Sequence, residues 1–202
     1  MNKIGIVTLN GYFNYGNRLQ NYALQETLKS FGCDVETIII DNETKYQKSN
    51  NNKIHPLKRI SNVKNKPLKD IVYRIQDRVW TLTHKKEILK SKAIREDIFI
   101  NFTKTYIKET DFTLSNKNMS EHLLQTYDYF VAGSDQVWNP SYNYGSSLYF
   151  LTFAEKNKRI AYAPSFGVSK IPEEVIENYR TWLNGIDKLS VREDDGARII
   201  KE

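Results

Sequence analysis

The sequence predicts an α/β fold in which helices flank a parallel sheet, and three observations lead to this class. Residues 3–9, KIGIVTL, form a continuous apolar and β-branched run, the pattern of a strand buried on both faces. A helical pattern follows at 18–32, and a second strand-like run, DVETIIID, covers 34–41. The same alternation returns after residue 127. Strands that alternate with helices form βαβ units, and βαβ units imply a parallel sheet.

The individual elements follow from local signals. The first helix places apolar side chains near helical spacing and ends at Gly32, a typical helix stop. The later expected elements are strands at 127–133, 159–167 and 188–193, a helix at 172–186 with Pro172 in its first turn, and the start of a helix at 194–202. Together they predict one Rossmann-like domain over residues 1–193, followed by the beginning of a linking helix.

A basic helical insert is expected at about 42–102. Residues 42–66 are rich in Asn, Lys and Ser, and two amphipathic helical patterns follow at 68–80 and 88–102. Residues 45–95 carry 15 Lys or Arg and three acids, a net charge of +12, whereas the rest of the chain is at −6. The basic character therefore belongs to the insert, and because that segment has few aromatic residues we expect no nucleic-acid partner.

Several classes of protein are excluded by what the sequence lacks. No apolar run approaches the roughly 18 residues that span a bilayer, and the N-terminus has no long signal-peptide core. The single cysteine, Cys33, has no Cys or His at metal-ligand spacing. We therefore expect a cytoplasmic protein without a metal or a cofactor. The three histidines lie outside the strand-end loops and are interpreted as surface residues.

The first candidate site is the polar loop of residues 10–18, between the first strand and the first helix. In open α/β sheets, ligands gather where strands end at their carboxyl side, and helix N-termini favour anions. Asn14, Asn17 and Arg18 could bind phosphate, carboxylate or sugar hydroxyls. The spacing of the glycines is neither GxGxxG nor that of a P-loop. The loop could equally be a turn in which Asn14 or Asn17 caps the helix.

The second candidate site is VAGSDQVWNP, residues 131–140, where polar side chains directly follow a strand. Ser134, Asp135 and Gln136 could bind paired sugar hydroxyls, and Trp138 has a flat apolar face of the kind on which sugars stack. The same stretch could be an Asx-turn, with the tryptophan anchoring the loop to the core.

The third candidate site combines APSFG, residues 163–167, with SVRE, residues 190–193. Ser165 lies at one strand end and Arg192 at another, and the planar fork of an arginine suits a carboxylate or a phosphate. Alternatively, Arg192 and Glu193 form a surface ion pair. Ser165 lacks the GxSxG context of a serine hydrolase.

In their order and spacing, these stretches resemble the polysaccharide pyruvyl transferase family. The matching segments are GYFNYGNRLQNYALQ (11–25), VAGSDQVWNP (131–140), YFLTFAEKNKRIAYAPSFG (149–167) and LSVRE (189–193). The resemblance covers the α/β domain almost entirely, and the insert at 45–100 only loosely. It implies the N-terminal half of a glycosyltransferase-B-like fold of two Rossmann-type domains.

The resemblance also implies a reaction, the transfer of pyruvate from phosphoenolpyruvate to two hydroxyls of a sugar as a cyclic ketal. The acceptor would be a saccharide or a lipid-linked saccharide of cell-surface polysaccharide biosynthesis. Arg18 and Arg192 would bind the donor's anionic groups, whereas Asp135, Gln136 and Trp138 would face the sugar, with Asp135 catalytic. The family's second domain, with its basic and histidine residues, has no counterpart in these residues, so we expect residues 1–202 alone to bind weakly and to turn over nothing measurable.

Three alternatives remain open at this point. The chain could be a non-catalytic sugar-binding fragment, half of a split enzyme, or a sugar-nucleotide glycosyltransferase of similar fold. If the acceptor is lipid-linked, residues 45–95 could lie against an anionic inner leaflet. The other interpretation of that segment is that its helices pack their apolar stripes on the domain and leave the lysines solvated.

Overall fold

The structure is a computed structural model that describes residues 1–12, 14–41, 79–116, 121–141 and 146–201. The chain divides into two compact units. The sheet unit comprises Met1–Glu43 and Phe99–Glu202, and the insert unit comprises Thr44–Ile98. Most of the insert's first amphipathic pattern, and much of its basic charge, lie outside the described residues.

The sheet unit is built on six strands that all pair in parallel, in the order β3-β2-β1-β4-β5-β6. The strands are β1 (Lys3–Val7), β2 (Asp34–Ile40), β3 (Glu109–Leu114), β4 (Tyr129–Ala132), β5 (Arg159–Ala161) and β6 (Lys188–Leu189). This arrangement confirms the predicted α/β class with a parallel, Rossmann-like sheet.

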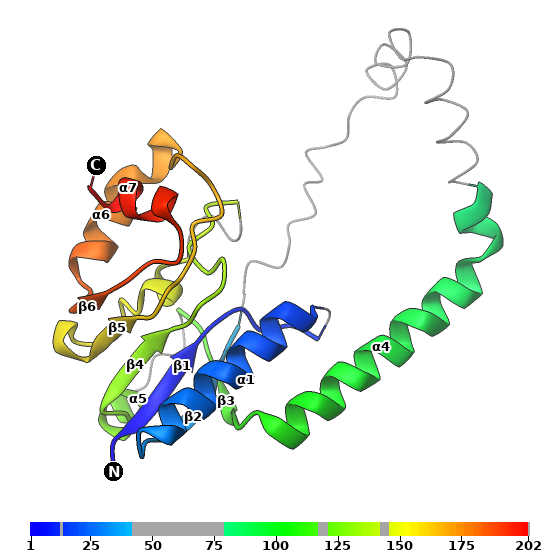
Figure 1. Ribbon diagram of the computed structural model, residues 1–202, viewed down its shortest axis with the longest axis horizontal. Coiled ribbons are helices and arrows are strands. Elements are labelled where there is room, and N and C mark those ends of the chain that lie inside the picture. Colours follow the sequence, from blue (N-terminus) through cyan, green and yellow to red (C-terminus); the bar gives the residue numbers. More distant parts are fainter. Residues whose placement is uncertain (13, 42–78, 117–120, 142–145, 202) are drawn as a thin grey trace, which may run out of the picture. The chain divides into compact units, whose positions relative to one another are not determined.

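Helices lie on both faces of this sheet (Figure 1). The described helices of the sheet unit are α1 (Tyr15–Ser30), α5 (Glu121–Thr126), α6 (Ile176–Asn184) and α7 (Asp194–Lys201), and three 3-10 turns cover Ser147–Phe150, Lys156–Lys158 and Glu173–Val175. A further helix, α4 (Lys85–Tyr106), begins in the insert unit and ends in the sheet unit. On one face Leu24 of α1 packs with Ile6 and Val131 of the central strands. On the other face a larger cluster includes Phe130 of β4 and Tyr179 of α6.

Four elements were not predicted or begin at another residue than expected. The edge strand β3 and helix α5 were not predicted; in β3 only Thr110 and Leu114 are buried, so ETDFTL lacks the apolar run of a central strand. Helix α1 begins at Tyr15, three residues early, because Asn14 caps it. Helix α6 begins at Ile176, because Pro172 precedes a 3-10 turn and not the α-helix itself.

The helix expected at 88–102 is present as part of α4. Phe99, in the sheet unit, is 1% exposed and packs on Tyr15, with ring centroids 4.3 Å apart. In the insert unit, by contrast, Leu89 and Ile94 are about half exposed. Among the described residues, no helix has the length and apolar content to cross a membrane.

Helix α1 buries a polar stripe as well as an apolar one. Asn21 Oδ1 accepts a hydrogen bond from Thr37 Oγ1 at 3.0 Å. Gln25 donates to the Tyr106 carbonyl and accepts from the Lys108 N–H, both at 2.8 Å. Buried amides are costly unless they are bonded, so this stripe specifies where β2 and the β3 edge meet the helix. Several polar residues of the segment 11–25 are therefore explained by packing.

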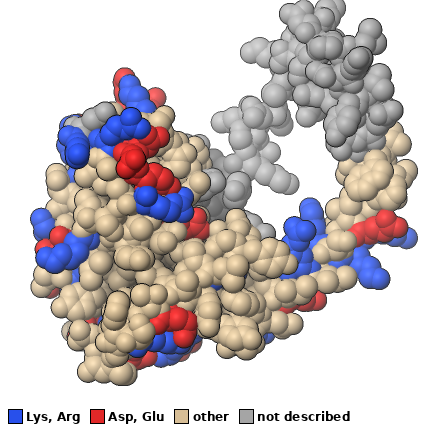
Figure 2. Space-filling model, viewed as in Figure 1, with Lys and Arg blue, Asp and Glu red and all other residues tan. Residues whose placement is uncertain are grey.

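Charged side chains of both signs intermingle on the face shown in Figure 2. Glu36 of β2 is a charged residue that is largely covered by its neighbours, with a side chain that is 12% exposed. Its Oε1 accepts hydrogen bonds from Lys3 Nζ and from Tyr127 Oη, each at 2.8 Å. Burial raises the pKa of Glu36, but these hydrogen bonds and the charges of nearby lysines outweigh it. The pKa therefore lies below its ordinary value of 4.5.

We expect Glu36→Gln to lower the free energy of unfolding by about 1.5–3 kcal/mol near neutral pH, the usual contribution of hydrogen bonds to a charged group. Because the folded-state pKa is depressed, this stability is complete above pH 4.5 and is lost as the pH falls through the folded-state value. Urea unfolding at about pH 7 and about pH 3 should show the difference shrinking in acid. Glu177→Gln, at a side chain that is 83% exposed, is the control. A difference independent of pH would contradict the prediction.

Candidate functional site

The strand order places a topological switch point between β1 and β4. From β1 the chain builds outward through β2 and β3, and from β4 it builds in the other direction through β5 and β6. In open α/β sheets, ligands bind in the crevice outside the carboxyl ends of the two strands at such a point. The loops that follow these strands begin at Thr8 and Gly133, so the first two candidate stretches flank the switch point.

Backbone hydrogen bonds join the loop after β4 to the loop after β5. The Ser165 N–H donates to the Asp135 carbonyl at 2.8 Å, and the Trp138 N–H donates to the Ser165 carbonyl at 3.2 Å. The Arg192 N–H donates to the Pro164 carbonyl at 3.3 Å. The second and third candidate stretches therefore form one continuous wall at the carboxyl edge of the sheet, which we call the loop wall (residues 133–139, 163–167 and 190–193).

Asp135 stands out within the loop wall. Its Oδ1 accepts a hydrogen bond from the Gln136 N–H at 2.7 Å. Its Oδ2 is buried and has no hydrogen-bond partner among the described residues. A buried carboxylate oxygen without a hydrogen bond lowers the stability of the folded protein. Such groups are typical of functional sites or of places where an ordered water binds. Asp135 is thus the residue of the loop wall with an unused acceptor.

Gln136 and Gly167 explain how closely the two loops pack. The Gln136 Oε1 accepts from Asn139 Nδ2 at 3.1 Å, so this amide group is engaged within the loop wall. A Cβ at Gly167 would lie 2.6 Å from Asn139 Nδ2 and 2.7 Å from Gln136 Oε1, and Gly167 has φ +62°. Both facts favour glycine there. Ser134, at the start of the wall, is half-buried.

Trp138 does not offer a face to a sugar, which corrects the expectation from the sequence. The side chain is 0% exposed, and its ring stacks on Phe150 with centroids 4.9 Å apart and planes at 4°. Phe166 covers it at 5.2 Å, and its Nε1–H donates to the Tyr149 carbonyl at 3.0 Å. Trp138 is an anchor of the loop wall, as the alternative interpretation had it.

Ser165 and Arg192 have structural partners. Ser165 is 0% exposed, and its Oγ accepts from the Gly167 N–H at 3.0 Å. Arg192 donates through Nε to Glu193 at 2.8 Å, and its Nη2 lies 2.7 Å from the same carboxylate. The Arg192 side chain is nevertheless 45% exposed, so this cation is accessible from solvent. The surface ion pair considered for Arg192 and Glu193 is present.

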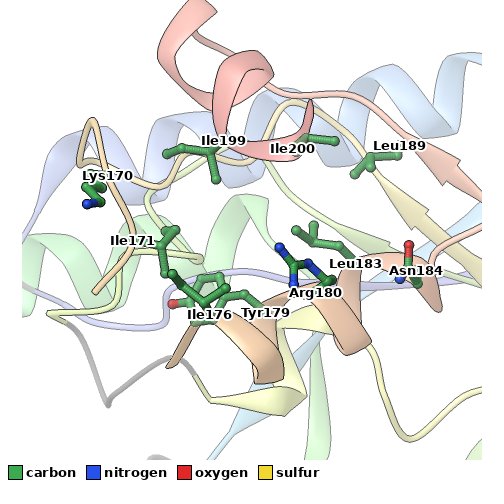
Figure 3. A pocket seen from close by; sticks show the side chains of 10 residues that line it. All are labelled: Lys170, Ile171, Ile176, Tyr179, Arg180, Leu183, Asn184, Leu189, Ile199 and Ile200. Atoms are coloured by element: carbon green, nitrogen blue, oxygen red, sulfur yellow. The ribbon is translucent and has the colours of Figure 1, made fainter. Parts of the chain in front are cut away.

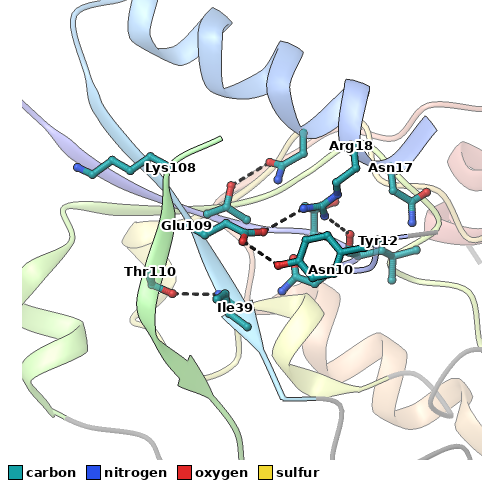
Figure 4. A network of polar contacts seen from close by, with 12 residues as sticks. Asn10, Tyr12, Asn17, Arg18, Ile39, Lys108, Glu109 and Thr110 are labelled. Atoms are coloured by element: carbon teal, nitrogen blue, oxygen red, sulfur yellow. Dashed lines mark hydrogen bonds and ion pairs between the residues drawn. The ribbon is translucent and has the colours of Figure 1, made fainter. Parts of the chain in front are cut away.

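Arg18 is buried, which corrects its expected role as an accessible anion-binding residue (Figure 4). Its side chain is 1% exposed, with Nη1 3.0 Å from Glu109 Oε1 and Nη2 3.0 Å from the Leu9 carbonyl. Its Nε has no partner among the described residues. The Tyr12 hydroxyl donates to the other Glu109 oxygen at 3.2 Å. Burial, together with the Glu109 charge, raises the pKa of Tyr12.

The remaining residues of the first stretch also serve the loop. Asn14 is the N-cap of α1, and its Oδ1 accepts from the Gly16 N–H at 2.8 Å. Asn17 is buried, at 7% exposed. Gln20, which was not predicted, donates to Thr8 Oγ1 at 2.8 Å, and its Oε1 is buried without a partner among the described residues. Asn10 Oδ1 is likewise buried without a hydrogen-bond partner among the described residues.

Buried polar atoms that lack a hydrogen-bond partner among the described residues therefore concentrate at the switch point. Six buried side-chain atoms lack a hydrogen-bond partner among the described residues, and four of them belong to Asn10, Arg18, Gln20 and Asp135. These four residues lie in the loops after β1 and β4 or in the first turns of α1. Glu109 could not be found from the sequence because it belongs to the unpredicted strand β3. Gln20 is the first glutamine of the helix, and periodicity gave no reason to select it.

Two hollows lie in the sheet unit, one beside α6 and α7 and one against part of the loop wall. One of about 310 Å³ lies between α6 and α7 and is mostly apolar (Figure 3). A second of about 250 Å³ is lined by residues 166–169 of the loop after β5 and by Glu193, Asp195 and Gly196. Its two carboxylates disfavour a phosphate there. The first hollow is walled chiefly by helix faces, so we base the site on the strand-end loops. The described residues contain no group of three His, Cys, Asp or Glu that could hold a metal ion.

Comparison with known proteins gives one result. A family model described as Polysaccharide pyruvyl transferase matches residues 14–202. No curated protein and no solved structure gives a significant match. The matched range includes α1, the loop wall and every strand except β1.

Proposed function

Because the chain belongs to the polysaccharide pyruvyl transferase family, we propose that its switch-point site takes part in transferring pyruvate from phosphoenolpyruvate to a saccharide. The observation that carries the proposal is the Asp135 carboxylate at the carboxyl edge of the sheet, because its buried Oδ2 accepts no hydrogen bond from the part of the chain that the structure describes. A carboxylate so placed can accept a hydrogen bond, and then a proton, from a hydroxyl group.

The proposed reaction makes two carbon–oxygen bonds at one carbon. One sugar hydroxyl adds to C2 of phosphoenolpyruvate, its proton passes to a base, and a proton is delivered to the methylene carbon, which becomes a methyl group. The second hydroxyl then displaces the phosphate from C2 and its proton passes to the departing phosphate, so that the products are a cyclic ketal and inorganic phosphate. Asp135 would be the base, acting on the hydroxyl that it positions.

The other residues have supporting parts in this proposal. Arg192 is the accessible cation of the loop wall and would bind a phosphate or carboxylate of the donor. Ser134 and Gln136 would contact the sugar from the same wall. The four residues Asn14, Asn17, Arg18 and Ser165 would hold the loops around the ligands. The acceptor is a saccharide or a lipid-linked saccharide.

Binding tests this proposal without requiring turnover. We expect phosphoenolpyruvate and a methyl hexopyranoside each to shift backbone amide resonances of the loops after β1, β4 and β5 in ¹H–¹⁵N spectra. Asp135→Asn should weaken the hexopyranoside about tenfold or more, because a hydrogen bond to a charged group contributes about 1.5–3 kcal/mol. The asparagine keeps the shape and the acceptor for the Gln136 N–H. Asp187→Asn, at the amino edge beside Lys188, is the matched control.

The same titrations separate the alternatives. A sugar-binding fragment would bind the hexopyranoside and not phosphoenolpyruvate, and a sugar-nucleotide glycosyltransferase would prefer a nucleoside diphosphate sugar to both. If phosphoenolpyruvate shifts no amide of the three loops at millimolar concentration, the proposed donor site is wrong. If Asp135→Asn and Asp187→Asn behave alike, the role of Asp135 is wrong.

A further inference from the structure

Tyr162 directly follows β5, and its side chain is 53% exposed at the carboxyl edge of the sheet. We propose that the Tyr162 ring is the platform on which a pyranose ring of the saccharide acceptor stacks. This inference rests on the proposed function and deepens it, because it names the residue that holds the acceptor's apolar face.

The register of the strands puts Tyr162 beside the switch point. The ladders that join β5 to β4 and β4 to β1 each continue one residue beyond the strands. The Tyr162 N–H donates to the Ala132 carbonyl at 2.9 Å, and the Gly133 N–H donates to the Val7 carbonyl at 3.0 Å. Tyr162, Gly133 and Thr8 therefore occupy one row across the carboxyl edge.

This row belongs to the face of the sheet that α1 covers. Thr8 accepts a hydrogen bond from Gln20 of α1, and a Cβ at Gly133 would lie 2.7 Å from Leu24 Cδ2 of the same helix. Ile160 packs in the cluster on this face, and because side chains alternate along a strand, Tyr162 lies on the same face two residues later.

The neighbour of Tyr162 across the ladder is Gly133, directly after β4, which contributes no side chain beside the ring. A Cβ at Gly133 would lie 2.7 Å from Leu24 Cδ2, so a side chain there would displace Leu24. The row thus runs from the exposed Tyr162 ring to Gly133 and Thr8, which are buried under α1. The exposed Tyr162 ring is the accessible apolar surface at this edge, and the loop after β4 carries the partly buried Ser134, so the edge suits a ligand with both apolar and polar groups, such as a pyranose.

The backbone that carries Tyr162 is held firmly. The next residue, Ala163, has φ +51°, a left-handed conformation that a non-glycine residue rarely adopts. Its N–H donates to Ser190 Oγ at 3.0 Å, and Ser190 Oγ donates to the Ala161 carbonyl at 2.9 Å. A ring on a pinned backbone loses little conformational freedom when a ligand binds.

Other aromatic residues of the loop wall cannot take this part. Trp138 and Phe166 are 0% and 1% exposed and pack on each other in the core. Among the described residues of the loops after β4 and β5, Tyr162 is the large aromatic that is exposed. One face of a pyranose presents mainly C–H groups, so stacking on a flat ring removes apolar surface from water and leaves the hydroxyls free for the polar loops.

Three variants of this chain test the platform. Tyr162→Ala should weaken the methyl hexopyranoside at least fivefold in ¹H–¹⁵N titrations and leave the phosphoenolpyruvate affinity within twofold. Tyr162→Phe keeps the ring and should retain the hexopyranoside affinity within about twofold. Phe31→Ala, at an aromatic that is 74% exposed at the opposite edge of the sheet, should change neither affinity. Thermal unfolding monitored by circular dichroism checks that each variant folds.

The outcomes separate the platform from the proposed function. If the hexopyranoside binds the wild-type chain and Tyr162→Ala binds it equally well, the platform is overturned while the proposed function stands. If Tyr162→Phe loses as much affinity as Tyr162→Ala, the hydroxyl and not the ring face is the contact, which also overturns stacking. If the wild-type chain binds neither the hexopyranoside nor phosphoenolpyruvate, the proposed function fails and the platform fails with it.

Discussion

Trp138→Ala is expected to lower the free energy of unfolding by about 3–5 kcal/mol, the usual cost of removing a large buried aromatic side chain. The ring is 0% exposed between Phe150 and Phe166, so its removal leaves a cavity that the stacked neighbours cannot close without moving. The loss would also release the Nε1–H bond to the Tyr149 carbonyl. Guanidinium unfolding followed by circular dichroism measures the change.

A graded series makes this prediction specific. Trp138→Phe keeps most of the ring and loses the Nε1–H donor, so we expect a smaller decrease of about 1–3 kcal/mol. Phe31→Ala removes an exposed aromatic side chain and should stay within about 0.5 kcal/mol of wild type. If Trp138→Ala were no more destabilising than Phe31→Ala, the packing of the loop wall on the core would be wrong. Where Trp138→Ala fails to fold, Trp138→Phe carries the comparison.

Glu109→Gln is expected to have an effect of comparable size, a loss of about 3–5 kcal/mol, because it leaves the Arg18 guanidinium buried without its counter-charge. Arg18 is 1% exposed, and its Nε already lacks a partner among the described residues, so little else can compensate the charge. The guanidinium also bonds the Leu9 carbonyl, so the loop after β1 should loosen together with the edge strand β3.

A double-mutant cycle tests the pair itself. Arg18→Met should also destabilise the chain, and the combination of Arg18→Met with Glu109→Gln should recover much of the loss, because it removes both buried charges. Lys29→Met breaks a half-exposed pair with Glu26 on α1 and should leave the unfolding midpoint unchanged. Strictly additive losses in the cycle would show that the two charges do not stabilise one another.

The central part of the fold could be predicted because of where its strands lie. β1, β2 and β4 have helices or loops on both faces, so their residues are apolar in nearly continuous runs that stand out in the sequence. β3 pairs with one neighbour only, at the edge, and leaves Asp111, Phe112 and Thr113 exposed. Its sequence therefore resembles a loop. For this reason Glu109, the partner of Arg18 on β3, could not be identified from the sequence either.

The location of the candidate site was predictable for a similar reason. Polar residues that directly follow buried strands must lie at the carboxyl edge of a parallel sheet, whatever the order of the strands. The direction of each side chain is a different matter. Whether Arg18 faces solvent depends on Glu109, 91 residues away, and whether Trp138 stacks on a ligand depends on Phe150 and Phe166.

The sequence by itself therefore determined the α/β class, the parallel sheet and the loops at which its polar residues gather, because these follow from local periodicity and chain direction. Only the tertiary structure decided that Trp138 and Arg18 are buried supports, that Asp135 Oδ2 is buried with no partner in the described ranges, and that Tyr162 is exposed beside Gly133. The physical reason is that burial and hydrogen bonding depend on partners from segments far away in the sequence. The strand order decides which segments become neighbours, and no single segment of the sequence determines that order.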